Sequence, residues 1–139
     1  MVPSIPYTVG LADDASFVVY RAYRSARSGS ELADRLRAIV ALATEHQLTR
    51  LMLDVRDTVF RASIATQYEY AYHQARKVGL LPQWRIALVV TPAERSYDFL
   101  ETALINAGYV ARLFHDPARA ADWLKGSGGV SSTLDKLPF

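Results

Sequence analysis

Two short runs of hydrophobic and β-branched residues near the start of the chain predict a β-hairpin. The first run is 7–11 (YTVGL), the second is 17–23 (FVVYRAY), and the polar stretch 12–16 (ADDAS) separates them. Polar turn residues between two strand-like runs are typical of a hairpin. Asp13 and Asp14 are therefore interpreted as turn residues, although paired carboxylates also raise the question of metal or acid–base chemistry.

The next segment, 28–47, predicts an amphipathic helix. Ser28 and Glu31 fit a capping box, in which each side chain accepts a hydrogen bond from the backbone N–H of the other residue, and Ser30 is a rival cap. The hydrophobic residues of this segment recur at helical spacing and form one apolar face: Leu32, Leu36, Ile39, Val40 and Ala43.

A second strand and helix are predicted within 50–78. The run 50–55 (RLMLDV) is typical of a strand covered on both faces. A helix from Ser63 to Val78 follows, with Gly79 as its C-cap. Tyr70 is expected to face water on this helix and to offer a partner an anchor, although a single exposed tyrosine is more often incidental. The expected buried face consists of Ile64, Tyr68, Ala71, Ala75 and Val78.

Two further strands, each followed by a helix, complete the pattern. The run 84–90 (WRIALVV) leads into Thr91, Pro92 and Glu94, which together predict a strong helix start, and Gly108 is the expected helix end. The last strand is 109–114 (YVARLF), and the last helix is 116–124, with Asp116 as its cap.

The predicted order, β-β-α-β-α-β-α-β-α, indicates an α/β fold with a mainly parallel sheet, an N-terminal β-hairpin and four helices. The first strand is expected at an antiparallel edge, where it is able to pair with a second copy in a homo-dimer. Residues 1–124 are expected to form a single domain. The Gly/Ser-rich residues 125–139 are expected to form a flexible tail.

Composition narrows the classes of function. The chain has no cysteine, which excludes disulfides and thiol chemistry. No apolar run approaches the ~18 residues of a membrane span, and the N-terminus lacks a secretory signal, so a cytoplasmic protein without membrane contact is expected. The net charge is only +2, and the basic residues do not cluster with aromatic ones as a nucleic-acid partner would require.

Asp54 and Asp57 are the strongest candidates for chemistry. They follow a buried strand, at the end where open α/β sheets usually bind ligands, and Thr91 follows a neighbouring strand. A phosphoacceptor or magnesium site is one interpretation, and the simpler one is that Asp54 accepts hydrogen bonds from loop amides. The three histidines lie on different elements without metal-ligand spacing, and no catalytic motif is present. Neither a cofactor nor enzymatic activity is expected.

The stretch 51–65 (LMLDVRDTVFRASIA) resembles the STAS family of anti-sigma-factor-antagonist-like (SpoIIAA-like) domains. That family carries a strand of the type LVLDL, then F-x-D-S-S-G-L, then a helix. Phe60 matches the aromatic residue and Ser63 the first serine. The resemblance covers Tyr7 to Leu124. Two further groups of residues match the family: Leu51, Leu53, Asp54 and Val55 match its strand, and Phe114, Asp116, Ala120, Trp123 and Leu124 match its last strand and helix.

The chain departs from the family pattern at the phosphorylation motif. Ala62 stands in place of the family aspartate, Ile64 in place of the second serine, which is the usual phosphate acceptor, and Ala65 in place of the glycine. Phosphorylation at the family position is therefore not expected. Ser63 is interpreted as a helix N-cap in preference to a phosphosite, although a helix N-terminus would stabilise a phosphate there.

The resemblance implies a non-enzymatic regulatory module that binds another protein, such as a kinase or a sigma-factor regulator. The partner would contact the loop that ends at the helix and one face of that helix, with Arg56, Asp57, Arg61, Ser63 and Tyr70 as the candidate residues. The alternative function is a carrier of a small nucleotide, lipid or other acyl ligand, bound in a cleft near Asp54 and Thr91. An Asp54–Asp57 hydrolase or phosphotransferase is a third hypothesis with weaker support.

Overall fold

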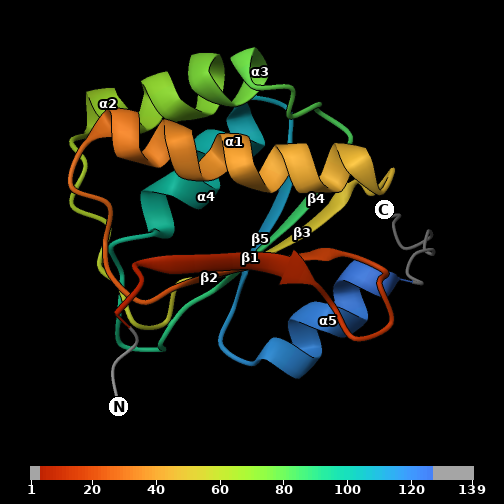
Figure 1. Ribbon diagram of the computed structural model, residues 1–139. Coiled ribbons are helices and arrows are strands. Elements are labelled where there is room, and N and C mark those ends of the chain that lie inside the picture. The colour runs from red at the N-terminus through yellow and green to blue at the C-terminus, as the bar shows by residue number, and fades with distance from the viewer. Residues whose placement is uncertain (1–3, 127–139) are drawn as a thin grey trace, which may run out of the picture.

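The computed structural model describes residues 4–126 and contains one five-stranded sheet in the order β1-β2-β3-β4-β5 (Figure 1). The strands are β1 (Tyr7–Leu11), β2 (Val18–Ala22), β3 (Arg50–Asp54), β4 (Arg85–Val89) and β5 (Val110–Phe114). β1 and β2 pair antiparallel, and every other pair is parallel. The predicted α/β class, the element order and the N-terminal hairpin are confirmed. The expected tail lies outside the described residues, except for residues 125 and 126.

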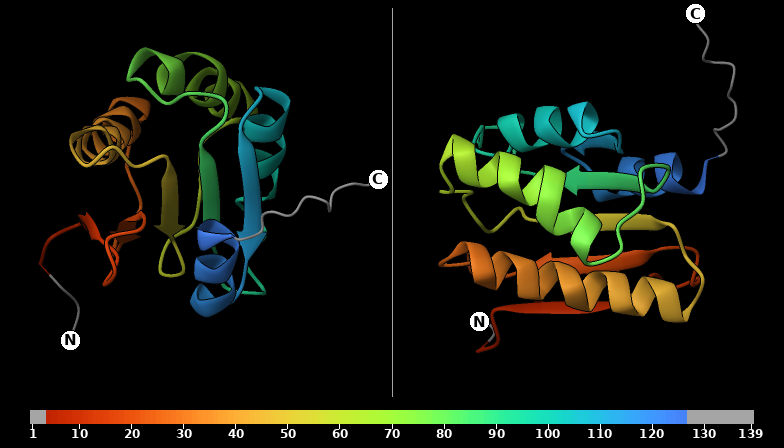
Figure 2. Two further views of the ribbon diagram at one scale, coloured as in Figure 1. Left: turned by 90° about the vertical axis from the view of Figure 1, so that its right-hand side faces the viewer. Right: turned by 90° about the horizontal axis from the view of Figure 1, so that it is seen from above.

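Four helical segments accompany the sheet. They are α1 (Gly29–Glu45), a continuous segment made of α2 (Ile64–Glu69), the π-helical turn η1 (Tyr70–Gln74) and α3 (Ala75–Lys77), then α4 (Asp98–Asn106) and α5 (Pro117–Lys125). The first three segments cover one face of the sheet and follow one another in chain order (Figure 2, right). α5 lies alone on the opposite face (Figure 1). None of the helices in residues 4–126 has the length and apolar character needed to cross a membrane.

The hydrophobic core is divided by the sheet into two clusters, because successive side chains of a strand point to opposite faces. The larger cluster packs the sheet against α1, the α2–α3 segment and α4, and its strand residues include Tyr20, Leu51 and Leu88. The smaller cluster packs the sheet against α5, with Met52 and Leu124 among its members. A ligand site on one face is therefore separated from the other face by the sheet.

Local sequence signals explain most helix ends. Ser28 accepts a hydrogen bond from the N–H of Glu31 and caps α1, and Asp116 accepts from the N–H of Ala118 and caps α5. The Glu31 carboxylate accepts from the N–H of Arg27 and not of Ser28, so the capping box forms only in part. The two helix-ending glycines, Gly79 and Gly108, both have φ of 103°, a conformation that glycine adopts without strain.

The predicted helix start at Thr91 is wrong. α4 begins only at Asp98, and residues between β4 and α4 form turns. The Thr91 hydroxyl donates to the carbonyl of Arg56 instead of capping a helix, and the Glu94 carboxylate accepts from the N–H of Ser96. Thr91 and Glu94, which the capping pattern assigned to a helix start, thus form other hydrogen bonds: Thr91 a long-range one and Glu94 a local one.

Candidate functional site

The parallel register of β2 and β3 places Arg21 directly beside Asp54, at the carboxyl end of both strands. Their neighbours Tyr20 and Leu53 point to the opposite face, toward the helical layer, since side chains alternate along a strand. The candidate residues therefore fall into two groups on the two faces of the sheet. One group is an ion-pair cluster on the α5 face, and the other lines a cavity under α1, η1 and α4.

Two arginines bind the carboxylate of Asp54 in the ion-pair cluster. Arg56 donates from Nε to Asp54 Oδ1 over 2.9 Å and from Nη2 to Oδ2 over 2.7 Å. Arg21 donates to the same Oδ2 over 2.6 Å and, from its other Nη, to Asp57 Oδ2 over 2.7 Å. The sequence grouped Asp54 with Asp57, and Arg21 connects these two carboxylates. The contact of Arg56 with Asp54 was not predicted, and Arg21 was missed because only the strand register brings it there.

The charge of Asp54 is compensated within this cluster. Burial alone would raise the pKa of Asp54, but the hydrogen bonds from Arg56 and Arg21 outweigh that effect and hold the pKa below its usual value. The interpretation that Asp54 accepts hydrogen bonds from loop amides holds only in part: within residues 4–126 one backbone N–H, that of Arg56, contacts it over 3.4 Å, and the main partners are the two guanidinium groups. No group of three or more metal-ligating side chains occurs within residues 4–126.

Thr91 stands beside this cluster as expected from the strand order. Its hydroxyl donates to the backbone carbonyl of Arg56 over 3.0 Å, which ties the loop after β4 to the loop after β3. Thr91 is exposed, and neither Thr91 nor Asp54 lines the cavity on the other face. The assignment of these two residues to a ligand site stays a prediction.

Ser63 caps the second helical segment. Its backbone is extended, with φ of −65° and ψ of 163°, and its hydroxyl oxygen accepts a hydrogen bond from the N–H of Thr66 over 3.1 Å. The same hydroxyl donates to Thr66 Oγ1 over 3.0 Å. The N-cap interpretation is confirmed. Arg61, just before the cap, is exposed, and its proposed role in partner binding stays a prediction.

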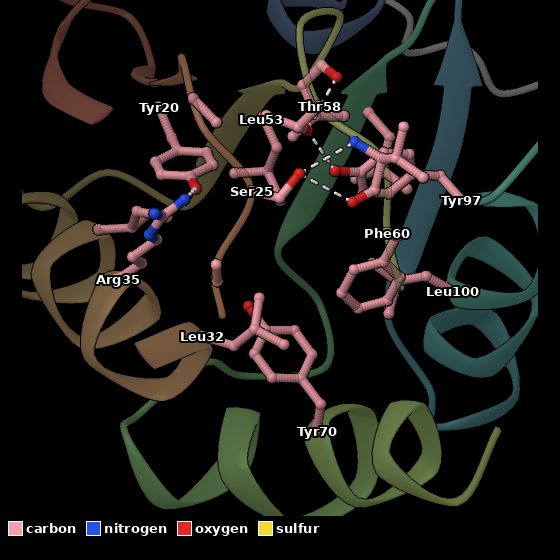
Figure 3. A pocket seen from close by; sticks show the side chains of 16 residues that line it. Tyr20, Ser25, Leu32, Arg35, Leu53, Thr58, Phe60, Tyr70, Tyr97 and Leu100 are labelled. Atoms are coloured by element: carbon pink, nitrogen blue, oxygen red, sulfur yellow. Dashed lines mark hydrogen bonds between the residues drawn. The ribbon is translucent and has the colours of Figure 1, made fainter. Parts of the chain in front are cut away.

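The expected position of Tyr70 is wrong. The side chain does not face water but points into the protein from η1, toward the sheet (Figure 3). Hydrogen bonds in η1 run from residue i to i+5, as between the Tyr70 carbonyl and the N–H of Ala75, so one turn holds an extra residue. Tyr70 follows the buried Gln67 by three residues and precedes the buried Ala71, so it lies on the inward side of the segment and is half-buried. Its role in partner binding stays a prediction.

Two residues that were expected in the core, Ile64 and Tyr68, are exposed instead, together with Tyr72. Ile64, Tyr68 and Tyr72 have exposed fractions of 61%, 40% and 38%, and their spacing of four residues places them on one side of the segment. We call these three residues the helix stripe. Tyr68 packs edge-on against Phe99 of α4, with ring centroids 5.2 Å apart, and lies 5.5 Å from the Tyr72 ring. The helix stripe is therefore an ordered apolar surface.

The cavity lies between the sheet and the helical layer, and has a volume of about 50 Å³ (Figure 3). Its walls are mainly apolar and come from three strands, three helical segments and the loops after β2 and β3. The polar side chains are few, and Arg35 is the one cation among the residues that line it. The apolar walls include Leu32, Ile39, Leu53, Phe60, Leu88 and Leu100.

Arg35 was not identified from the sequence, although a signal was present. It stands three residues after Leu32 and four before Ile39, in the middle of the apolar face predicted for its helix. An arginine at that position must either turn away or carry its charge into the core. In the structure Arg35 carries its charge into the core, since its side chain is only 5% exposed.

Comparison of the chain with protein-family models, with curated proteins and with solved structures found no match in any of the three. The resemblance to STAS domains thus rests on the residues quoted above.

We expect Asp54→Asn to destabilise the domain by roughly 2 kcal/mol, less than the ~3–5 kcal/mol for a fully buried pair, because both arginines contact water. The pKa of Asp54 is lowered in the folded state. The stability that its ionised carboxylate contributes is therefore complete at pH values above the ordinary pKa of about 3.8, and it is lost as the pH falls through the folded-state pKa. Urea unfolding between pH 7 and pH 3 should therefore show a weaker acid sensitivity in the variant. Asp34→Asn, in the exposed pair with Arg37, is the control and should change stability little. Equal effects of the two substitutions would contradict the assignment.

We expect Ser63→Ala to lower the free energy of unfolding by about 1 kcal/mol, and Ser63→Gly by only a few tenths. The reason is that alanine leaves the N–H of Thr66 without its side-chain acceptor, whereas glycine leaves room for water to solvate it. Urea unfolding at neutral pH measures both values. A Ser63→Ala protein as stable as the wild type would show that the cap contributes nothing to stability.

Proposed function

We propose that this domain is a non-enzymatic regulatory module that binds another protein through the helix stripe. The single observation behind the proposal is the outward exposure of Ile64, Tyr68 and Tyr72 on one side of an ordered helical segment. Aromatic residues are enriched among the residues that dominate binding energy at interfaces. The resemblance to STAS domains supports binding at the same segment, since it implies that a partner contacts this helix and the loop before it.

The order of the helix stripe supports recognition of a partner. Tyr68 is held against Phe99 and lies next to Tyr72, so little side-chain entropy is lost when a partner covers them. Polar residues border the stripe: Arg61 precedes the cap, and the Glu69 carboxylate contacts His73 Nδ1 over 2.7 Å. An apolar centre with a polar rim is the usual composition of a protein interface.

The ion-pair cluster does not favour the hydrolase or phosphotransferase hypothesis. A nucleophilic or basic carboxylate needs a free lone pair and room for substrate, whereas guanidinium groups occupy both oxygens of Asp54. Asp57 shares Arg21 with it. This cluster is better suited to fixing the loop from Arg56 to Ser63, which leads into the helix stripe.

A second candidate function, small-molecule binding, is favoured by the cavity under the helical layer. The site proposed for it differs from the Asp54–Thr91 cleft considered from the sequence, because those residues lie on the other face of the sheet. With a volume of about 50 Å³, the cavity accommodates a few water molecules or a short apolar group but not a whole nucleotide.

Partner binding is tested with the immobilised domain in lysate from its own cells, followed by quantitative mass spectrometry of retained proteins. We expect Ile64→Glu with Tyr72→Glu to reduce retention of the specific partner at least tenfold, because charges would enter an apolar contact. The matched control is Ile105→Glu on α4, which alters a residue of similar exposure, 50%, outside the stripe. It should retain the partner as the wild type does.

Both variants should melt within a few degrees of the wild type, since all three side chains are exposed. Retention of the same proteins by wild type, stripe variant and control would rule out the helix stripe as the binding surface. If the domain retains no protein above the level found on blank resin, the proposed function is contradicted.

A further inference from the structure

Arg35 carries a permanent charge into the interior. Its guanidinium stays protonated at any physiological pH, and its side chain is 95% buried between α1 and the sheet. A buried charge is costly unless a counter-ion and hydrogen bonds compensate for it. The partners of this guanidinium therefore indicate whether the protein itself completes the site.

The partners at hydrogen-bond distance are neutral. Nη1 donates to the Tyr20 hydroxyl over 3.0 Å and to the backbone carbonyl of Arg24 over 2.8 Å. The ring of Tyr7 covers the guanidinium, with its centroid 4.9 Å from the Arg35 carbon Cζ. These contacts fix the side chain in place, but none of them supplies a negative charge.

The remaining edge of the guanidinium, formed by Nε and Nη2, has no hydrogen-bond acceptor among residues 4–126, and its one ion-pair partner there is distant. Nε is buried and has no hydrogen-bond partner there. The nearest carboxylate to Nη2 is Glu31 Oε1, at 3.7 Å, which is beyond hydrogen-bond distance. That same oxygen accepts from the N–H of Arg27 over 2.8 Å, so Glu31 is committed to the start of α1.

Arg56 shows what this edge binds elsewhere in the protein. Its Nε and Nη2 donate in parallel to the two oxygens of Asp54, over 2.9 Å and 2.7 Å. This bidentate geometry is the preferred contact of an arginine with a carboxylate. Arg35 presents the same pair of donors, already oriented by Tyr20 and the Arg24 carbonyl, but the Glu31 carboxylate approaches only Nη2 and stays 3.7 Å away.

The surroundings of Arg35 combine a polar end with an apolar body. Arg35 lines the apolar cavity and also the adjoining surface cleft, where Arg24 and Arg27 outnumber the one carboxylate, Glu31, and leave that end with a net positive charge. Tyr70 projects from η1 toward the same cavity (Figure 3). Burial raises the pKa of Tyr70, so the hydroxyl stays protonated and available as a donor.

We infer that the cavity binds a small carboxylic acid with an apolar body, whose carboxylate pairs with Nε and Nη2 of Arg35. The apolar body packs against Leu32, Phe60 and Leu100, and the Tyr70 hydroxyl adds a hydrogen bond to the carboxylate. The volume of about 50 Å³, well below the ~150 Å³ of a cavity that holds a benzene ring, restricts the body to a chain of a few carbon atoms. This inference rests on the second candidate function and does not depend on partner capture by the helix stripe.

Binding is tested by NMR titration of the wild-type chain with propionate and butyrate, each compared with its neutral amide, propionamide or butyramide. The acid and the amide have nearly the same shape, so the comparison isolates the charge without altering the protein. We expect an acid to bind at least tenfold more tightly than its amide, because an ionic, bidentate contact is replaced by a neutral one.

The matched variants are Arg35→Gln and Arg37→Gln on the same helix. Arg37 is exposed and pairs with Asp34 at the surface, so its substitution should leave the affinity for the acid unchanged. Arg35→Gln should weaken acid binding at least tenfold. Tyr70→Phe removes one hydroxyl without changing the packing and should weaken it about threefold to tenfold, which provides a check if Arg35→Gln fails to fold.

Three results would overturn the inference. Equal affinity for acid and amide would leave small-molecule binding standing but remove the role of the charge. An Arg35→Gln protein that folds and binds the acids as the wild type does would place the carboxylate elsewhere. Absence of binding of both acids at millimolar concentration would show that Arg35 serves only to fix α1 against β2.

Discussion

The order of the strands is the constraint on which the rest of this structure depends. β2 to β5 lie side by side in chain order and run parallel, so each connection must carry the chain back across the sheet. Right-handed crossovers then place α1, the α2–α3 segment and α4 on a single face, and only α5 remains for the other. The crowded face contains the cavity on its inside and the helix stripe on its outside. The sparsely covered face leaves the carboxyl ends of β2 and β3 open for the ion-pair cluster. The strand order thus separates three candidate sites: the cavity, the helix stripe and the ion-pair cluster.

Two arginines on opposite faces of the sheet differ in how their positive charge is compensated. Arg56 meets the carboxylate of Asp54 through its Nε and Nη2, and this pair stabilises the loop that leads to Ser63. Arg35 offers the same atoms to an apolar cavity, where residues 4–126 supply only hydroxyl and carbonyl oxygens at hydrogen-bond distance and the Glu31 carboxylate stays 3.7 Å away. Keeping such a charge buried lowers stability unless something binds it. The segment that contains the π-helical turn η1 contributes to both candidate binding surfaces, because Tyr70 points inward to the cavity while Tyr68 and Tyr72 are exposed.

Much of the fold followed from the sequence because local signals and the global topology agree. The strand runs, the caps at Ser28, Ser63 and Asp116 and the grouping of Asp54 with Asp57 were all predicted. The helix start at Thr91 was not, because a tertiary hydrogen bond to Arg56 competes with the capping pattern. Tyr70 was placed on the wrong side because the predicted apolar face was started at Ile64 and Tyr68, whereas the observed buried face includes the polar Gln67. Arg21 joins its aspartates only through strand register, and the buried position of Arg35 depends on neighbours contributed by the N-terminal hairpin.

The most direct measurement concerns the Arg35 Nε–H group itself, observed by ¹⁵N NMR of the wild-type protein as butyrate is added. If the carboxylate pairs with this edge of the guanidinium, the Arg35 Nε–H signal shifts strongly and its exchange with water slows, while the Arg56 Nε–H signal, already bound to Asp54, stays unchanged. If butyrate shifts the signals of other residues but leaves Arg35 Nε–H untouched, the buried guanidinium is not the ligand-binding group.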